Sequence, residues 1–351
     1  MSGDSGPDVA ETPGPASAPV ILSTYRFSHR SITRLAVGNA LRYGADLDEL
    51  IASASAVRER VSVLAVGPIT PAVKDHHLAA LPRLGLIAVY GVGYDHVDVI
   101  AAHRRQVSVT NTVIAETPTV EVAIGLMIGV ARRLREGDAL IRAGAWPALD
   151  MSEMVGTGLS GKQLGLIGLG RIGRGVARVA RSLGMRLVYT QRRRASRSME
   201  DALGATYLPL AALLRTSDIV SIHCPLTAET RHLIDAAALS LMKTTAILVN
   251  TSRGGIVDTT ALESALGAGQ LAGAGLDVFE DEPVVAPALM TMPNVFLTPH
   301  LGGATSTSRE AMAEVLVEQI LDFRAGLLPT SLVGDARVAA AGDAVARSSN
   351  A

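Results

Sequence analysis

Residues 163–180, QLGLIGLGRIGRGVARVA, contain an apolar run, a glycine-rich turn and a segment with apolar residues at helical spacing. A strand, the turn G-x-G-x-x-G and a helix, in this order, form the pyrophosphate-binding unit of dinucleotide-binding folds. Gly168 is expected to make the tight turn, Gly170 to let the backbone approach the ligand, and Gly173 to let the helix pack on the strand. The helix amino terminus would offer free N–H groups to the phosphates. A purely structural glycine turn is the alternative. The cofactor contacts expected here are Gly168, Gly170, Arg171, Ile172 and Gly173.

Strand-like and helix-like patterns alternate on both sides of this unit, which is typical of a parallel sheet covered by helices. Before it lie three β-branched runs, VSVLAVG (61–67), LGLIAVYG (84–91) and VSVTNT (107–112). From residue 163 onward there are six, QLGLIGLG, RLVYT, DIVSIHC, AILVNTS, GAGLDVF and VFLTPH. The sequence therefore predicts the α/β class, with two doubly wound parallel-sheet domains. One long helix is expected from about Val120 to Ala143, apolar on most faces and buried at a domain or subunit boundary.

The composition excludes several classes of protein. The chain has 351 residues and a formal net charge of -1, so no basic footprint for nucleic acid is present. Cys224 is the only cysteine, which rules out an intrachain disulfide and a Cys-rich metal site. His76 and His77 have no carboxylate or cysteine at ligand spacing, so no metal is expected. The apolar run 122–131 is too short for a membrane span, and the first eighteen residues do not read as a signal peptide. We expect a cytoplasmic protein with disordered tails at 1–19 and 336–351.

Three polar stretches follow strands of the second sheet: NTSRGGIVD (250–258), LDVFEDEP (276–283) and LTPHLGG (297–303). Ligands gather at the carboxyl ends of parallel strands, so Arg253, Glu282 and His300 are expected to converge there. These residue types fit the reduction of a 2-oxo acid. Arg253 would bind the carboxylate and polarise the carbonyl, His300 would donate a proton, and Glu282 would raise the pKa of the imidazole. Asp277 would orient the nicotinamide carboxamide. Taken singly, a surface salt bridge and a loop histidine are the alternatives.

These stretches, with GLGRIG (168–173), HCPLTAETRHLI (223–234) and LMKTTAILVNTSRGGIVD (241–258), resemble the D-isomer-specific 2-hydroxyacid dehydrogenases. The resemblance covers roughly residues 60–330. It implies that Arg253, Glu282 and His300 are the catalytic set. It also implies a discontinuous substrate domain, 20–118 with 304–335, a cofactor domain, 119–303, and a cleft between them with hinges near Thr119 and Gly303.

The resemblance extends to further contacts. YGVGYDHVD (90–98) is similar to the family's substrate loop, in which the N–H groups of Val92 and Gly93 would meet the substrate carboxylate. The helix and arm of residues 119–160, through Trp146, would form a homodimer contact; a buried interdomain helix is the alternative. The remaining cofactor contacts expected from the family are Cys224, Pro225, Thr230 and Thr251.

The end of the second cofactor-domain strand departs from the NAD-using members, which carry an aspartate there. LVYTQRRRAS (187–196) has Gln191 at that position, followed by Arg192, Arg193 and Arg194. An aspartate would repel a 2′-phosphate and arginines would bind it, so NADP is expected, with NAD as a weaker alternative. A solvated basic loop is the alternative. Such a cofactor choice resembles the glyoxylate and hydroxypyruvate reductases of the family.

Other functions on the same scaffold stay open from sequence alone. Corepressors of the C-terminal binding protein type keep similar motifs, although the arginine loop argues against them. Formate dehydrogenases are relatives with glutamine where this chain has Glu282, and a Glu–His pair favours a hydroxyacid. A dehydrogenase for a bulkier 2-oxo acid is a third alternative.

Overall fold

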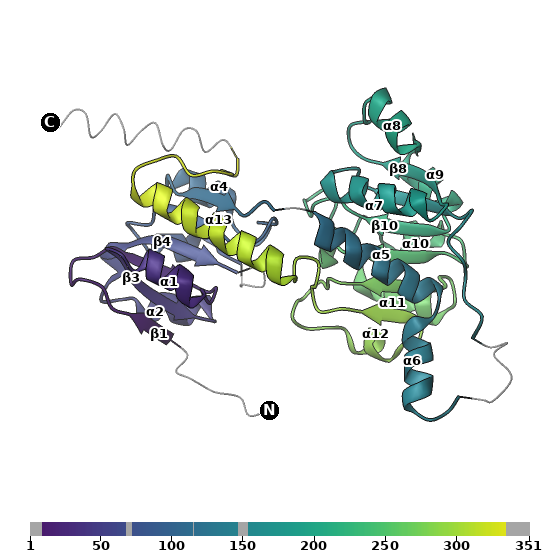
Figure 1. Ribbon diagram of the computed structural model, residues 1–351, viewed down its shortest axis with the longest axis horizontal. Helices are drawn as coiled ribbons and strands as arrows, with labels where there is room; N and C mark the ends of the chain where they lie inside the picture. The colour runs from purple at the N-terminus through teal and green to yellow at the C-terminus, as the bar shows by residue number, and fades with distance from the viewer. Residues whose placement is uncertain (1–8, 68–71, 115, 147–153, 335–351) are drawn as a thin grey trace. The chain divides into compact units, whose positions relative to one another are not determined.

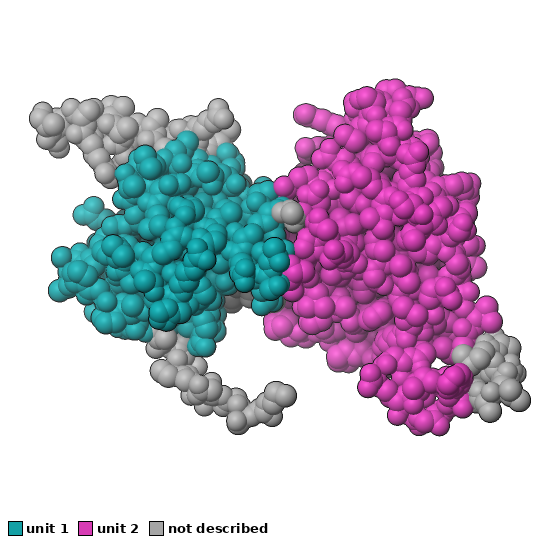
Figure 2. Space-filling view, in the orientation of Figure 1, with its two compact units in different colours: residues 1–114, 306–351 teal, residues 115–305 magenta. Residues whose placement is uncertain are grey.

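The computed structural model describes residues 9–67, 72–114, 116–146 and 154–334. The chain divides into two compact units, residues 1–114 with 306–351 and residues 115–305 (Figure 2). The boundaries expected from sequence lie a few residues away, at 118/119 and 303/304. Each unit contains its own sheet, and the α/β class with two parallel-sheet domains is confirmed.

The first unit is a six-stranded sheet in the order β1-β3-β2-β4-β5-β6. Strands β2 to β6 are parallel and follow the flavodoxin-like order, while β1 pairs antiparallel with β3 at the edge. The carboxyl-terminal helix α13 returns to this sheet, where it contacts α1 and β5 and buries Leu316, Val317 and Ile320 (Figure 1). The strands are β1 Val9–Thr12, β2 Val20–Ser23, β3 Ala40–Gly44, β4 Val61–Val66, β5 Leu86–Val89 and β6 Ser108–Asn111; the helices are α1 His29–Leu35, α2 Leu47–Ser53, α3 Asp75–Ala79, α4 Val99–Arg104 and α13 Ser306–Arg324.

The expected amino-terminal tail is wrong in part, because β1 lies within residues 1–19. A strand at the edge of a sheet has a row of unpaired backbone N–H and C=O groups. Strand β1 pairs with that row on β3, and Thr12 lies opposite Leu41. Residues 1–8 and the expected tail 336–351 lie outside the described residues.

The second unit is a seven-stranded sheet in the order β13-β12-β11-β10-β7-β8-β9, parallel throughout. The short edge strand β9 was not expected from sequence. The strands are β7 Gln163–Ile167, β8 Arg186–Thr190, β9 Ala205–Tyr207, β10 Ile219–Ile222, β11 Ile247–Asn250, β12 Gly273–Leu276 and β13 Val295–Leu297. The helices are α5 Thr117–Ala131, α6 Leu134–Arg142, α7 Arg171–Ser182, α8 Arg197–Leu203, α9 Leu210–Thr216, α10 Ala236–Ser240, α11 Thr259–Gly267 and α12 Pro287–Thr291.

Strands of this sheet are buried on both faces. In β8, Leu187 and Tyr189 belong to one hydrophobic cluster, whereas Val188 between them belongs to another. Successive side chains of a strand point to opposite faces, so two clusters mean two covered faces. This explains why the sequence shows continuous apolar runs rather than an alternation with polar residues.

The single long helix expected over residues 120–143 is wrong, because the structure has two helices there, α5 and α6. Arg133 between them is left-handed, with φ 54°, and the carbonyl of Ala131 accepts a hydrogen bond from the Thr157 N–H. No residue of α6 is buried, and this helix extends away from the rest of its unit in Figure 1. Among the described residues, no helix combines the length and apolarity that crossing a membrane requires.

Candidate active site

The glycine-rich turn lies where the strand order of the second unit reverses, between β7 and β10. Gly168 has φ 101°, and a Cβ there would lie 2.7 Å from the carbonyl carbon of His223. A Cβ on Gly173 would lie 2.2 Å from the Gly168 oxygen. By contrast, a Cβ on Gly170 would meet no described atom within 4 Å. Protein packing therefore requires glycine at 168 and 173, whereas the space at 170 suits a ligand outside the chain.

The amino terminus of α7 fits a phosphate in the same way. Gly170 is its N-cap residue, and no side chain caps the helix. The first N–H groups of a helix lack intrahelical partners, and together with the helix dipole they attract anions. Arg171 is exposed at the first helical position, and Ile172 is half-buried next to it.

The other expected cofactor residues follow β10 and β11. The Oγ1 atom of Thr251 is buried and has no hydrogen-bond partner among the described residues, which leaves a polar atom for a ligand. Thr230 is engaged locally, since its Oγ1 donates to the Pro225 carbonyl at 2.7 Å and accepts from the Thr227 N–H at 2.7 Å. Burial raises the pKa of the Cys224 thiol to about 11, so it remains a neutral packing group. Burial also lowers the pKa of His223 to about 4, so that its ring is neutral beneath the glycine turn.

The arginine loop after β8 contains three guanidinium groups in two different situations. Arg192 and Arg193 are exposed and, within the described part of the chain, their guanidinium groups make no hydrogen bond or ion pair. Arg194 instead donates from Nε and Nη2 to the two carboxylate oxygens of Glu200, at 2.8 and 2.9 Å. The sequence left open which of the three arginines would face a phosphate. It could not predict the ion pair of Arg194 with Glu200, because no sequence motif links these two residues.

The catalytic candidates come together at the carboxyl edge of β11, β12 and β13. Nδ1 of His300 lies 2.7 Å from Oε2 of Glu282, and Oε1 of Glu282 accepts the Phe279 N–H at 3.0 Å. Burial alone would raise the pKa of Glu282. The hydrogen bond and charge of His300, the Phe279 N–H and the charge of Arg253 outweigh burial and lower that pKa below its ordinary value. Glu282 is thus an ionised partner for the imidazole.

Arg253 is positioned by the turn after β11. Its carbonyl accepts from Asn250 Nδ2 at 2.9 Å, and its Nη1 donates to the Ser252 carbonyl at 2.8 Å. The next residue, Gly254, packs so closely on Phe279 that a Cβ would lie 1.9 Å from the Phe279 carbonyl carbon. This glycine joins the turn that carries Arg253 to the segment that carries Glu282.

Asp277 fixes the loop that carries His300. Its side chain is fully buried, and its carboxylate accepts from Thr298 Oγ1 at 2.6 Å, from Leu301 N–H at 2.7 Å and from Gly302 N–H at 2.8 Å. Burial raises the pKa of Asp277 in spite of these donors. His300 itself is left-handed, with φ 53°, a conformation that is uncommon for a non-glycine residue and recurs at functional sites. These contacts of Asp277 orient the loop, and its role toward the nicotinamide carboxamide stays a prediction.

The expected substrate loop belongs to the first unit and follows β5. Thr112 Oγ1 accepts the Gly91 N–H at 2.6 Å, and Asn111 Nδ2 donates to the Val92 carbonyl at 2.6 Å. Val92 and Gly93 therefore lie in a loop held from the end of β6, with the Val92 side chain exposed.

The structure brings a carboxylate to the two histidines for which the sequence showed none. Asp48 Oδ1 lies 2.8 Å from His77 Nε2 and 3.8 Å from His76 Nε2. However, His77 Nδ1 accepts the Lys74 N–H at 3.0 Å, so the ring proton of neutral His77 must sit on Nε2 and donate to Asp48. A metal at Nε2 would have to displace that proton, and the geometry favours the hydrogen bond.

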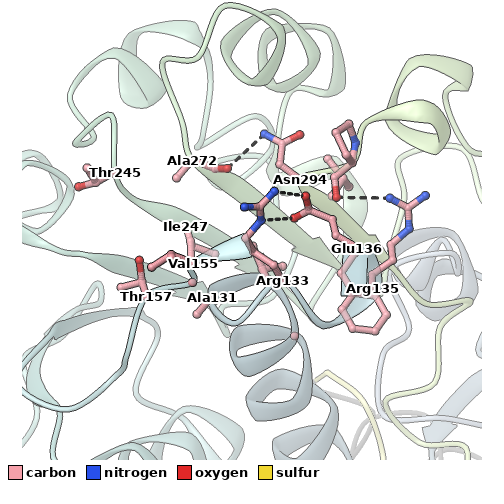
Figure 3. A pocket seen from close by; sticks show the side chains of 16 residues that line it. Ala131, Arg133, Arg135, Glu136, Val155, Thr157, Thr245, Ile247, Ala272 and Asn294 are labelled. Atoms are coloured by element: carbon pink, nitrogen blue, oxygen red, sulfur yellow. Dashed lines mark hydrogen bonds and ion pairs between the residues drawn. The ribbon is translucent and has the colours of Figure 1, made fainter. Parts of the chain in front are cut away.

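A pocket of about 360 Å³ lies at the opposite, amino-terminal edge of the seven-stranded sheet (Figure 3). Its lining includes Ile247, Ala272 and Val295, which lie at or next to the first residues of β11, β12 and β13, and the Arg133–Glu136 ion pair. Because parallel sheets bind their ligands at the carboxyl edge, this pocket is separate from the glycine turn and from His300.

The reversed strand order with its glycine turn and open helix terminus defines a dinucleotide-binding α/β protein. Residues 124–302 match the family model described as D-isomer specific 2-hydroxyacid dehydrogenase, NAD binding domain. The chain therefore belongs to the D-isomer-specific 2-hydroxyacid dehydrogenase family, and it is an NAD(P)-dependent enzyme. The resemblance in the motifs is confirmed, as is the interpretation as an enzyme.

Individual relatives agree with this assignment. Glyoxylate reductase from Thermococcus litoralis is 44% identical over 270 residues, which cover 76% of this chain and 81% of that protein. The structure of a glyoxylate reductase from Paecilomyes thermophila matches with a TM-score of 0.81 and 32% identity, over 91% of this chain and 99% of that one. The NADPH-dependent glyoxylate/hydroxypyruvate reductase from Sinorhizobium meliloti, in complex with NADP and malonate, matches with a TM-score of 0.80 and 34% identity, over 91% and 97%.

Proposed function

We propose that this protein reduces small 2-oxo acids, glyoxylate and hydroxypyruvate, to 2-hydroxy acids of the D configuration where a stereocentre forms, with NADPH as the reductant. The observation that carries the proposal is the 2.7 Å contact between His300 and Glu282 at the edge that also bears Arg253 and the glycine turn. Relatives named glyoxylate reductase support the choice of a small substrate.

The three side chains divide the chemistry between them. Arg253 binds the substrate carboxylate and polarises the carbonyl with its fixed fork of donors. The bound coenzyme supplies hydride to the carbonyl carbon. Because Nδ1 of His300 is held by Glu282, the proton for the carbonyl oxygen comes from Nε2. The His300 side chain is 23% exposed, so solvent can restore that proton.

In this proposal the coenzyme phosphates lie on the amino terminus of α7, and the 2′-phosphate lies against Arg192 and Arg193. No acid stands at position 191 to bond a ribose 2′-hydroxyl or repel a phosphate there. The NADP complex of the Sinorhizobium meliloti enzyme supports NADP as a coenzyme of this scaffold.

The first unit acts in the proposal as the substrate domain, in which the N–H groups of Val92 and Gly93 bind the carboxylate of the substrate.

We also propose a homodimer, in which a second copy of the chain covers α6, whose residues are all unburied, and Trp146, which is 62% exposed. Light scattering of the purified protein tests this homodimer, and a monomeric mass at micromolar concentration would contradict it.

The function is tested by assaying the purified protein with glyoxylate, hydroxypyruvate and phenylpyruvate, each with NADPH and with NADH. We expect the highest kcat/KM for glyoxylate or hydroxypyruvate with NADPH. A preference for phenylpyruvate contradicts the substrate, and equal use of NADH contradicts the coenzyme.

A further inference from the structure

The arginine loop, residues 191–196, is fastened at both of its ends. At its start, Gln191 Oε1 accepts the Leu169 N–H at 3.1 Å, and Gln191 Nε2 donates to the Arg193 carbonyl at 2.7 Å. At its end, the Ala195 N–H donates to Tyr189 Oη at 2.9 Å. The loop is thus tied to the glycine turn on one side and to a buried strand residue on the other.

A buried carboxylate organises the second fastening. Glu200, in α8, is 4% exposed and accepts both donors of the Arg194 fork and the Tyr189 hydroxyl, the latter at 2.7 Å. The fork of Arg194 and the Tyr189 hydroxyl lower the pKa of Glu200 to about 2, so the group is ionised at neutral pH. The bidentate geometry is specific to arginine, because a lysine offers a point charge and no fork.

This network separates the three arginines by role. Arg194 is paired with the buried carboxylate of Glu200, although its own side chain is 58% exposed. Arg192 and Arg193 lie between the two fastenings with exposed side chains, and within the described residues their guanidinium groups have no such partner. A loop that is already ordered loses less conformational entropy when a ligand binds, so its contacts contribute more to affinity.

We infer that Tyr189, Glu200 and Arg194 are positioning residues that set coenzyme specificity, because they hold Arg192 and Arg193 in place for the 2′-phosphate. In this inference Arg194 makes no contact with the phosphate. The inference rests on the proposed use of NADPH and adds three residues that do not touch the coenzyme.

The test measures binding of 2′,5′-ADP and 5′-AMP, which differ only in the 2′-phosphate, to the full-length protein by titration calorimetry. Wild type is expected to prefer 2′,5′-ADP by about tenfold or more. Tyr189→Phe removes a hydroxyl and no charge, and it should reduce that preference by roughly threefold to tenfold while 5′-AMP binding changes little. Arg194→Lys keeps the charge but loses the fork, and it should have a similar effect.

Tyr207→Phe is the matched control. Tyr207 lies on the neighbouring strand β9, its ring is 5.6 Å from that of Tyr189, and the variant keeps the ring near Arg194. Its preference for 2′,5′-ADP should equal that of wild type.

The outcomes separate the two proposals. If wild type shows no preference for 2′,5′-ADP, the NADPH assignment fails. If wild type shows the preference and Tyr189→Phe and Arg194→Lys retain it in full, the positioning role is overturned. A parallel loss of both ligands in these variants also overturns it, because that would indicate a merely structural network. Should one variant fail to fold by circular dichroism, the other decides.

Discussion

Two carboxylates of the seven-stranded unit each hold a basic side chain at hydrogen-bond distance, and the two contacts have different roles. Glu282 holds His300 at 2.7 Å, with side chains 18% and 23% exposed. Glu200 holds Arg194 at 2.8 Å and is itself 4% exposed. An imidazole can gain and lose a proton near neutral pH, whereas a guanidinium keeps its charge. The first contact is therefore suited to proton transfer and the second to fixed geometry.

The surroundings agree with this difference. His300 lies in a loop held by Asp277, and its side chain is 23% exposed. Glu200 has Tyr189 as a further donor, so that three hydrogen bonds from two side chains fix the position of the carboxylate. Experiments that remove one basic side chain or the other should thus change different properties of the enzyme.

The largest effect is expected from His300→Ala, which removes the proposed acid. A general acid contributes typically about a hundredfold or more, so kcat for glyoxylate reduction should fall by at least that factor. Binding of NADPH, measured by fluorescence titration, should stay close to wild type. His232→Ala is a matched control, because it breaks another His–Glu contact of 2.7 Å, with Glu280, and should cost far less. Activity retained in His300→Ala would remove this residue from its role.

The next effect concerns the arginine loop. Gln191→Asp combined with Arg192→Ala places an acid at the ribose and removes one exposed cation. One charge-assisted contact corresponds to roughly tenfold to hundredfold in affinity, and the preference for NADPH over NADH should fall by that factor. The loss should come from weaker NADPH binding, with kcat at saturating coenzyme preserved. An unchanged ratio of the two dissociation constants would mean that the loop is only solvated.

A smaller effect is expected from Glu282→Gln, read from the pH dependence of kcat/KM. The pKa of Glu282 is below its ordinary value of 4.5, so in wild type the carboxylate is charged throughout the neutral range and stabilises protonated His300. Reduction requires the protonated ring, so activity is lost as the pH rises. Without the negative charge that loss should begin at lower pH, by roughly one unit. An alkaline limb at the wild-type position would show that Glu282 does not act on His300.

The smallest effect is the response to salt. Arg192 and Arg193 are exposed, and exposed charge contacts are screened as the Debye length falls from about 10 Å at 0.1 M to about 3 Å at 1 M. Over this range NADPH binding should weaken a few-fold more than NADH binding. Equal salt dependence of the two dissociation constants would argue against a phosphate at these arginines.

Sequence features predicted the fold correctly where the contacts that require them lie within a few residues or a few ångströms of the backbone. The glycine spacing at 168, 170 and 173 predicts the turn because two of the three positions are forced by backbone contacts within a few ångströms. The helix expected over residues 120–143 failed at Arg133, since no pattern reveals a left-handed arginine. Strand β1 was missed for a related reason, because its four residues are ordered by the edge of β3 rather than by their own apolarity.

The site shows the same limit. The proximity of His300 and Glu282 was expected, because the carboxyl ends of parallel strands share one edge and the family motifs carry both residues. The approach of Asp48 to His77 was not, since the two come from different helices, α2 and α3, and no motif joins them. Burial of Glu200 was equally unreadable, because a glutamate near the start of a helix usually faces water.

The sequence by itself determined the two-sheet α/β architecture and the edge at which the chemistry lies, because hydrophobic period and glycine spacing act through the backbone. It also presented three consecutive arginines without distinguishing them. Only the tertiary structure decided that Arg194 pairs with Glu200, while the guanidinium groups of Arg192 and Arg193 have no such partner among the described residues. That decision depends on which side chains reach the buried carboxylate once α8 has packed against α7 and β9, and it is therefore a property of the packed fold.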